Sequence, residues 1–241
     1  MRTKLYYNTI NDELHTVLTR LMTADEFESF RLVGGTSLSL QLGHRISVDI
    51  DLFTDAGYKS IDFDAIDKFL RKNFPYVDSP SFGEVAFGKS YYIGENADRA
   101  VKVDLYYTDP YIRPVQQVDG IRMAHIEDIA AMKLEVVGNG GRKKDFWDLD
   151  ELSQIYSLEQ MLGFYEGRYP YSYTKEEILK SLVSFESADE ESDPVSLRDK
   201  PWQLIKLDIE DIVKRYSQQQ SQSQRPNIQR KPPKRGNSLK M

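Results

Sequence analysis

The chain has 241 residues, of which 40% are hydrophobic and 29% are charged, a composition ordinary for a globular protein that buries a substantial core. It contains no cysteine, which excludes disulfides, thiolate metal sites and a cysteine nucleophile. The sequence has no signal-peptide pattern and no apolar run of the roughly 18 residues that a membrane span needs. We therefore expect a cytoplasmic protein with no membrane partner.

The net charge of −6 is distributed unevenly along the chain. Residues 217–241 carry six basic side chains and no acidic one, so this segment contributes +6 and the remaining body carries −12. A body with this charge is no general nucleic-acid-binding surface, and any contact with a nucleic acid would be local. The segment has almost nothing apolar to bury, and we expect it to be disordered.

The first half of the chain alternates between helical and strand periodicities. We predict, in order, a helix over 8–22, a strand over 30–33, a helix that Thr36 or Ser37 caps and that ends near Gly43, a strand over 48–53, a helix over 61–73 and an antiparallel meander over 81–107. This order predicts a mixed β-sheet with flanking helices.

After Pro114 the periodicity is helical. We predict helices over 126–137, 143–156, 158–165, 175–185 and 202–216, with an acidic loop over 186–193. The whole pattern predicts an α+β fold with a mixed-sheet core at 1–124, a helical domain at 125–216 and a disordered basic tail at 217–241.

The strongest chemical signal lies in the segment over 31–53, where Asp49 and Asp51 flank one isoleucine in a predicted strand. Residues two apart in a strand point the same way, so both carboxylates would leave one face. The core would receive the alternate residues, which are Val48, Ile50 and Leu52. Two adjacent carboxylates repel each other unless a cation lies between them. An exposed strand face is the alternative, but Asp is disfavoured in strands, and we favour a Mg²⁺ site.

Gly34 and Gly35 stand directly before Thr36 and Ser37, between a predicted strand and a predicted helix. The two glycines could simply form a tight turn. The alternative is that their missing side chains let backbone N–H groups at a helix N-terminus approach a phosphate. Their position just ahead of the two acids favours phosphate binding.

A third acid, Asp104, lies alone in the apolar strand pattern VKVDLYY. By itself it would be a solvated strand residue. On a strand beside the first pair it would complete a three-carboxylate metal site, and it could also deprotonate an attacking hydroxyl group. We favour the functional interpretation because the first pair already predicts a metal.

Two basic residues are candidates for contact with phosphate. Lys133 stands on an otherwise apolar helix, where it would either extend out of the buried face or hold its charge against triphosphate oxygens. Arg45 lies just before the acid pair, where it would either close the loop or reach a phosphate. The pattern alone leaves both alternatives open.

The segment RKKDFWD at 142–148 places Asp145 and Asp148 three residues apart, on one face of a predicted helix. Asp145 falls in the first turn, where the helix dipole favours an acid, and we expect it to cap the helix. Asp148 would act as a base or as a partner for a lysine.

The glycine pair, the helix, the Asp-x-Asp strand and the lone strand Asp, in that order, resemble the nucleotidyltransferase superfamily of DNA polymerase beta. The chain is more specifically similar to the AbiEii/AbiGii branch of abortive-infection toxin nucleotidyltransferases. The similarity spans about residues 25–155. The residues that carry it are Gly34 to Leu38, Arg45 to Ser47, Asp49 to Phe53, Lys133 and Lys144 to Leu149.

This resemblance implies an enzyme that uses Mg²⁺ to transfer a nucleotide from an NTP to an acceptor, which in relatives can be a tRNA 3′ end. It implies that Gly35 holds the triphosphate, together with the hydroxyl of either Thr36 or Ser37. It also implies that Asp49 and Asp51 hold the metal.

The later motifs receive roles from the same resemblance. Lys133 would contact the phosphates, and Asp145 or Asp148 would be catalytic. The family also implies a cognate antitoxin as partner. Two alternatives remain open, namely transfer of the nucleotide to a protein, and a catalytically silent binding module whose basic tail contacts nucleic acid or an acidic partner.

Overall fold

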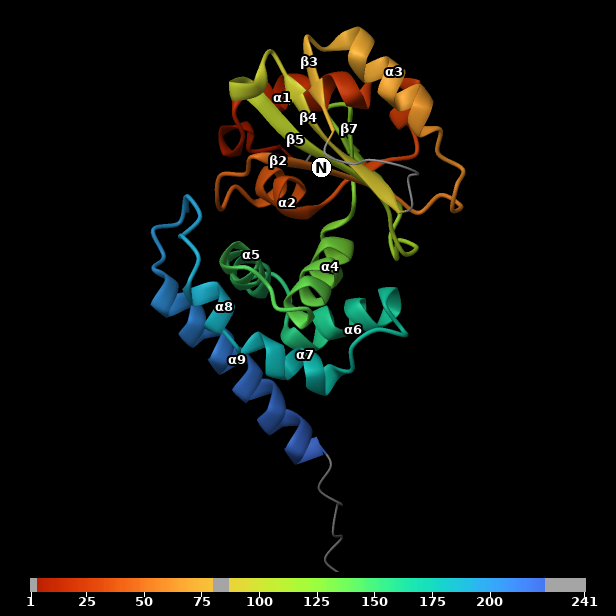
Figure 1. The fold of residues 1–241 in the computed structure, drawn as a ribbon. Coiled ribbons are helices and arrows are strands. Elements are labelled where there is room, and N and C mark those ends of the chain that lie inside the picture. Colours follow the sequence, from red (N-terminus) through yellow and green to blue (C-terminus); the bar gives the residue numbers. More distant parts are fainter. Residues whose placement is uncertain (1–3, 80–86, 224–241) are drawn as a thin grey trace, which may run out of the picture.

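The computed structural model describes residues 4–79 and 87–223. Within these residues, seven strands form one sheet in the order β3-β4-β5-β2-β1-β7-β6 (Figure 1). The strands are β1 (Arg31–Leu32), β2 (Asp49–Thr54), β3 (Tyr76–Asp78), β4 (Gly88–Gly94), β5 (Ala100–Tyr107), β6 (Gln116–Val118) and β7 (Ile121–Met123). The sheet is mixed, as predicted, because β2–β5 and β1–β7 are parallel and the other pairs are antiparallel.

Helices lie on both sides of this sheet and continue below it (Figure 1). The α-helices are α1 (Asp12–Met22), α2 (Gly34–Leu42), α3 (Phe63–Asn73), α4 (Ile126–Gly138), α5 (Lys143–Ser153), α6 (Leu158–Arg168), α7 (Lys175–Leu182), α8 (Glu186–Asp189) and α9 (Trp202–Ser223). Short 3₁₀ turns occur at Tyr7–Thr9, Asp25–Phe27 and Ala97–Arg99. The predicted α+β class is confirmed.

One face of the sheet carries the core that α1 and α3 cover, and α2 lies on the opposite face (Figure 1). Leu14 of α1 and Ile66 of α3 are fully buried with Ile50 of β2 and Val103 of β5 in one apolar cluster. Each such side chain stabilises the fold by about 1.5–3 kcal/mol. Because strand residues alternate between faces, the acids of β2 and β5 are turned toward α2.

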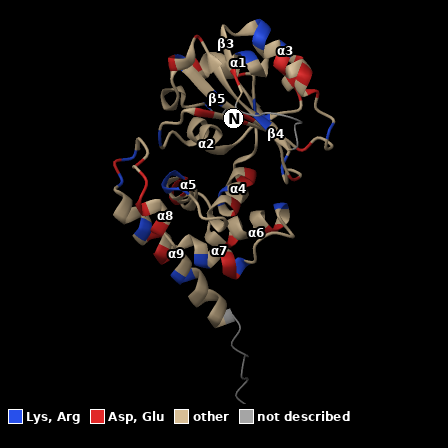
Figure 2. Ribbon diagram, viewed as in Figure 1, with Lys and Arg blue, Asp and Glu red and all other residues tan. Residues whose placement is uncertain are grey.

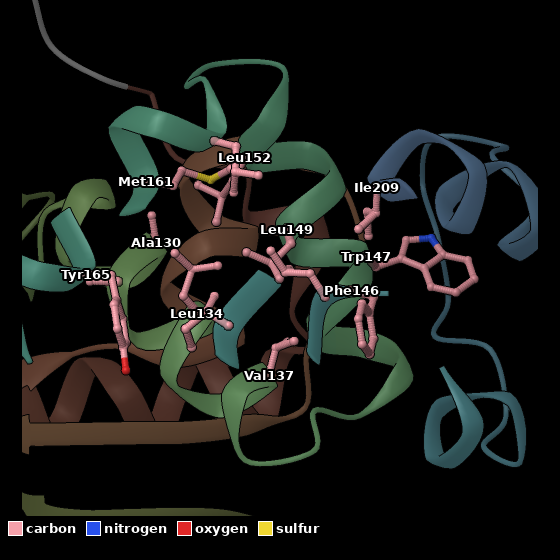
Figure 3. Packing of buried hydrophobic residues seen from close by; sticks show 14 of the residues in the cluster. Ala130, Leu134, Val137, Phe146, Trp147, Leu149, Leu152, Met161, Tyr165 and Ile209 are labelled. Atoms are coloured by element: carbon pink, nitrogen blue, oxygen red, sulfur yellow. The ribbon is translucent and has the colours of Figure 1, made fainter. Parts of the chain in front are cut away.

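Helices α4 to α9 form a second apolar cluster below the sheet, which Figure 3 shows from close by. Leu134 of α4, Leu149 of α5 and Tyr165 of α6 meet there. Capping boxes stabilise the starts of α6, at Ser157, and of α7, at Thr174. Both α4 and α5 contact α2, so the helical layer closes against the face of the sheet that carries the acids.

The start of α2 differs from the prediction. The helix begins at Gly34 with Val33 at the N-cap position, so Thr36 and Ser37 are buried inside the helix and do not cap it. Thr36 instead donates its hydroxyl hydrogen to the backbone carbonyl of the first β2 residue. The end at Gly43 is as predicted, in a left-handed conformation (φ +71°) that favours glycine.

The strand predictions were wrong at three places, the first of which is β3, a strand that lies before the predicted meander and was missed. Val48 lies before β2 and is 59% exposed, so it does not enter the core. The β6–β7 hairpin was missed, because strands of three residues are too short to show an alternating pattern. Its signal was the Asp119-Gly120 turn, in which both residues have positive φ, as the favoured two-residue hairpin turns require.

Several predicted helix ends also need correction. The helix predicted over 143–156 ends at Ser153, which leaves Ile155 exposed. The predicted acidic loop begins with the short helix α8, and α9 continues to Ser223, into the segment predicted to be disordered. Residues 224–241, and the part of the predicted meander at 81–86, lie outside the described residues.

Within the described segments, no helix combines the length and apolar character that crossing a bilayer requires.

Candidate active site

The two central strands bring three acids to one face of the sheet. β2 and β5 pair in parallel, with Asp51 opposite Asp104 and Asp49 opposite Lys102. These four side chains line one pocket, which the start of α2 and residues of α4 and α5 also enclose. Asp104 therefore faces the same pocket as the Asp49 and Asp51 pair, where the sequence led us to expect it.

The glycines at the start of α2 lie directly over the acids. Gly34 has a φ of +66°, and a Cβ atom at this position would collide with Oδ2 of Asp51. A Cβ atom on Gly35 would collide with Nη2 of Arg45. Only glycine lets the backbone of this helix end come so close to both side chains.

Asp51 has the most perturbed carboxylate of the pocket. Burial raises its pKa to about 6, and repulsion by the Asp104 carboxylate adds to this increase, while the Lys133 ammonium opposes it. Asp49 contributes further repulsion. Burial and two neighbouring carboxylates therefore act together to raise the pKa of Asp51.

The other two acids already have partners from the chain. Asp104 accepts hydrogen bonds from Ser90 Oγ at 2.6 Å and from Lys102 Nζ at 2.6 Å, one on each carboxylate oxygen. Asp49 Oδ2 lies 3.5 Å from Lys144 Nζ. In the described part of the chain, no three acidic or histidine side chains stand close enough to hold one metal ion in this arrangement.

A buried ionic cluster lies behind the pocket, with Asp148 at its centre. The Asp148 side chain is 0% exposed and accepts hydrogen bonds from His44 Nε2 at 2.7 Å and from Arg45 Nε and Nη2 at 2.7 and 2.8 Å. Lys133 Nζ lies 2.6 Å from Oδ2 of Asp148, the oxygen that Arg45 Nη2 also contacts. Burial opposes ionisation of Asp148, but Arg45 and Lys133 outweigh it and hold its pKa well below the ordinary value.

Asp145 has the capping role that the sequence predicts. Its Oδ2 accepts the backbone N–H of Arg142 at 3.1 Å at the start of α5, and its Oδ1 accepts from Lys133 Nζ at 2.6 Å. Burial disfavours its charged form, but the Lys133 ammonium outweighs this effect and lowers its pKa. Asp145 is therefore an ionised carboxylate with both oxygens engaged.

The two predicted phosphate contacts, Lys133 and Arg45, both line the pocket and are almost fully buried. Lys133 is held between Asp145 and Asp148, and these carboxylates raise its pKa despite the burial that disfavours its charge. Arg45 is held by Asp148 in a two-pronged ion pair. Contact of either residue with phosphate stays a prediction.

A family model described as the nucleotidyl transferase AbiEii toxin of a type IV toxin–antitoxin system matches residues 16–229. The chain belongs to this family. It is therefore a nucleotidyltransferase, and membership of a toxin–antitoxin family implies a cognate antitoxin as partner.

Two solved structures and one curated sequence are similar to this AbiEii-family chain. The uncharacterised protein aq_aa25 of Aquifex aeolicus strain VF5 is 30% identical over 195 residues, covering 76% of this chain and 86% of the relative. JHP933 from Helicobacter pylori has a TM-score of 0.56 at 18% identity, covering 87% of this chain and 92% of that one. MenT4, the nucleotidyltransferase toxin Rv2826c from Mycobacterium tuberculosis H37Rv, has a TM-score of 0.51 at 12% identity, covering 83% and 82%. Both structures share the fold described above.

Four polar side chains at this AbiEii-family site were given no site role from the sequence. Lys102 precedes Asp104 by two residues in an alternating strand, so the same-face rule could have found it. Arg142 and Lys144 line the pocket from the basic start of α5, which lies below the sheet (Figure 2). Nothing in the sequence pattern points to Ser90, because its contact with Asp104 depends on the β4–β5 register.

Proposed function

We propose that this AbiEii-family protein is a toxin that uses Mg²⁺ to transfer a nucleotide from an NTP to an RNA acceptor, with a tRNA 3′ end as the expected acceptor. One observation carries the proposal, namely that the glycine start of α2 lies against the Asp51 carboxylate within one pocket. A phosphate-binding helix end and a metal-binding strand face thereby meet. Transfer from a triphosphate requires this, because the metal ion and the helix end must bind the same triphosphate.

The charge of the pocket supports binding of a triphosphate. No side chain within the described residues caps α2, so the N–H groups of its first turn are left for an anionic ligand. Five basic side chains line the pocket. They are Arg45, Lys102, Lys133, Arg142 and Lys144. In a body of net charge −12, this local concentration of cations favours a polyphosphate at this place.

The donor set fits Mg²⁺. Carboxylate oxygens are the hard ligands that this ion prefers, and Asp49 and Asp51 would hold it. Burial is the main cause of the raised pKa of Asp51, and a bound cation would offset the added repulsion by Asp104 and Asp49. When bound, the metal would stabilise charge on the α-phosphate and on the leaving pyrophosphate.

Residues of the chain would bind the triphosphate and accept the proton of the acceptor. The N–H groups at Gly34 and Gly35 would hold the triphosphate, and the ammonium of Lys133 would face its charge. Asp104 would accept the proton of the attacking hydroxyl, whose oxygen forms the bond to the α-phosphorus as the bond to pyrophosphate breaks. Ser90 and Lys102 orient the Asp104 carboxylate for that step.

Asp148 fits a positioning role better than a catalytic one. It is sealed behind Arg45 and Lys133 and is fully buried, so it does not reach a substrate in the pocket. Asp145 lines the pocket, but one of its oxygens accepts a hydrogen bond from the start of α5 and the other accepts one from Lys133. Both acids would thus act on the reaction through the lysine and arginine that they hold in place.

The test is incubation of the full-length protein with each labelled NTP, Mg²⁺ and either total RNA or total protein. We expect label in RNA, and we expect Asp49→Asn to lose at least 100-fold of the rate, because one of the two metal ligands on β2 is neutralised. The matched control is Asp98→Asn, an exposed acid outside the pocket. Equal rates for wild type and Asp49→Asn would contradict the proposal. Label in protein and not in RNA would show that the acceptor is a protein.

A further inference from the structure

The face of the sheet that carries the acids continues across β4 to the edge strand β3. Helices α1 and α3 contact β3, β4 and β5 from the other side. The side chains of β4 differ in exposure between the two faces of the sheet. Tyr91 and Ile93 are fully buried, whereas Tyr92 between them is 39% exposed. Tyr92 therefore stands on an open sheet surface, on the same face as Asp104.

The strand register arranges this open surface in rows. Ser90 pairs with Asp104, Tyr92 pairs with Lys102, and Tyr76 of β3 pairs with Gly94. Diagonal neighbours on adjacent strands are about 7–8 Å apart, so Tyr92 and Asp104 start from backbone positions about that far from each other. This spacing is of the order of one nucleotide. Two half-exposed tyrosines and a lysine thus lead from the sheet edge to the acids.

The direction from which an acceptor must arrive follows from the sheet order. The helix end at Gly34, which would hold the triphosphate, follows directly on β1 and lies over Asp51 of β2, whereas β5 and β4 continue the sheet on the other side of β2. Attack in line with the leaving pyrophosphate comes from the side opposite to it. The acceptor hydroxyl must therefore approach over β4 and β5, which is where the open surface lies.

From this arrangement we infer that the open face formed by Tyr76, Tyr92 and Lys102 binds the unpaired 3′-terminal nucleotides of an RNA acceptor. Bases stack on tyrosine rings whatever their identity, and Lys102, which pairs with Tyr92 and contacts Asp104, would face the phosphate of the terminal nucleotide. Asp78 pairs with Tyr92 from β3 and would repel phosphate there, so the RNA backbone must pass on the Lys102 side of the Tyr92 ring. The inference rests on the proposed function and adds the route that brings the terminal hydroxyl to Asp104.

The test measures binding of a single-stranded oligoribonucleotide to the full-length protein by fluorescence anisotropy, without NTP or Mg²⁺. Tyr92→Leu removes the ring from an exposed position and should weaken binding about 5- to 100-fold, which is the range for loss of one stacked base. Tyr92→Trp should preserve the affinity. The matched control is Tyr171→Leu, because Tyr171 is 100% exposed and lies outside the sheet.

A base analogue reports the stacking itself. Fluorescence of 2-aminopurine near the 3′ end should be quenched on binding to the wild type and to Tyr92→Trp, and should not be quenched by Tyr92→Leu. Unchanged affinity and quenching in Tyr92→Leu would overturn the inference, and so would an equal loss in Tyr171→Leu. Failure of the proposed function is a separate result, since absence of transfer by the wild type leaves the binding measurement unaffected.

Discussion

At the scale of single residues, Asp148 organises three segments that are distant in sequence. His44 and Arg45 come from the connection between α2 and β2, Lys133 comes from α4, and Asp148 itself comes from α5. A buried ion pair need not stabilise a protein relative to apolar residues, but removal of one partner leaves the others as unpaired charges. The helical layer is held against the sheet in part by this cluster.

Substitution Asp148→Ala should therefore lower the free energy of unfolding by about 3–5 kcal/mol, because the buried Arg45 loses its carboxylate partner and Lys133 keeps only Asp145. Urea denaturation measures the change. Glu151→Ala is the matched control on the same helix, because its partner Arg198 is exposed and such a pair contributes at most about 1 kcal/mol. Similar losses in the two variants would contradict this account of the cluster.

The pH dependence of stability tests the same cluster. The pKa of Asp148 is well below its ordinary value of 3.8 in the folded protein, so its contribution is fully present above that value and is lost as the pH falls through the folded-state pKa. The difference in unfolding free energy between wild type and Asp148→Asn should shrink as the pH falls from about 5 to about 2. A difference that stays constant over this range would show that folding does not lower the pKa of Asp148.

At the scale of elements, the start of α2 is shaped by what lies beneath it. Gly34 adopts a left-handed conformation over Asp51, and Gly35 fits over Arg45. Glycine is therefore required at these positions by the packing as well as by the proposed phosphate contact. Both requirements follow from the close approach of the backbone. The sequence could indicate the glycines but not the side chains that approach them.

Two glycine substitutions test the structural reason for a glycine at position 34. Gly34→Ala should destabilise the protein by at least about 1–2 kcal/mol, because an L-residue resists this φ and its Cβ would collide with Asp51. Gly163→Ala, in the middle of α6 with open space around its Cα, should stabilise it by about 0.5–1 kcal/mol. Thermal or urea unfolding measures both, and a neutral Gly34→Ala would contradict the described contact.

At the scale of the whole molecule, the two layers meet at the pocket and a late segment holds them together. The backbone N–H of Ile46 donates to Val195 at 2.9 Å, and that of Leu197 donates to His44 at 2.8 Å. The segment before α9 thus lies along the connection that carries Arg45. The pocket is therefore built from residues between Val33 and Asp145 and is supported from the C-terminal half.

Much of this arrangement could be predicted from the sequence where the signal is local. Alternation placed Asp49, Asp51 and Asp104 on one face, and helical periodicity found the longer helices. The partners of Lys133 and Arg45 could not be assigned, because their contacts with Asp148 are tertiary and leave no periodic trace. The missed hairpin had only a turn signal, and exposure of Val48 depended on where β2 begins.

The most direct test of the central claim is the fate of two differently labelled nucleotides. The protein is incubated with RNA, Mg²⁺ and an NTP that carries radioactive phosphorus at either the α or the γ position. Nucleotidyl transfer predicts that only the α label enters RNA, and that Asp49→Asn abolishes this while Asp98→Asn does not. Entry of the γ label into the product, or equal incorporation by wild type and Asp49→Asn, would contradict the claim that this pocket transfers a nucleotide.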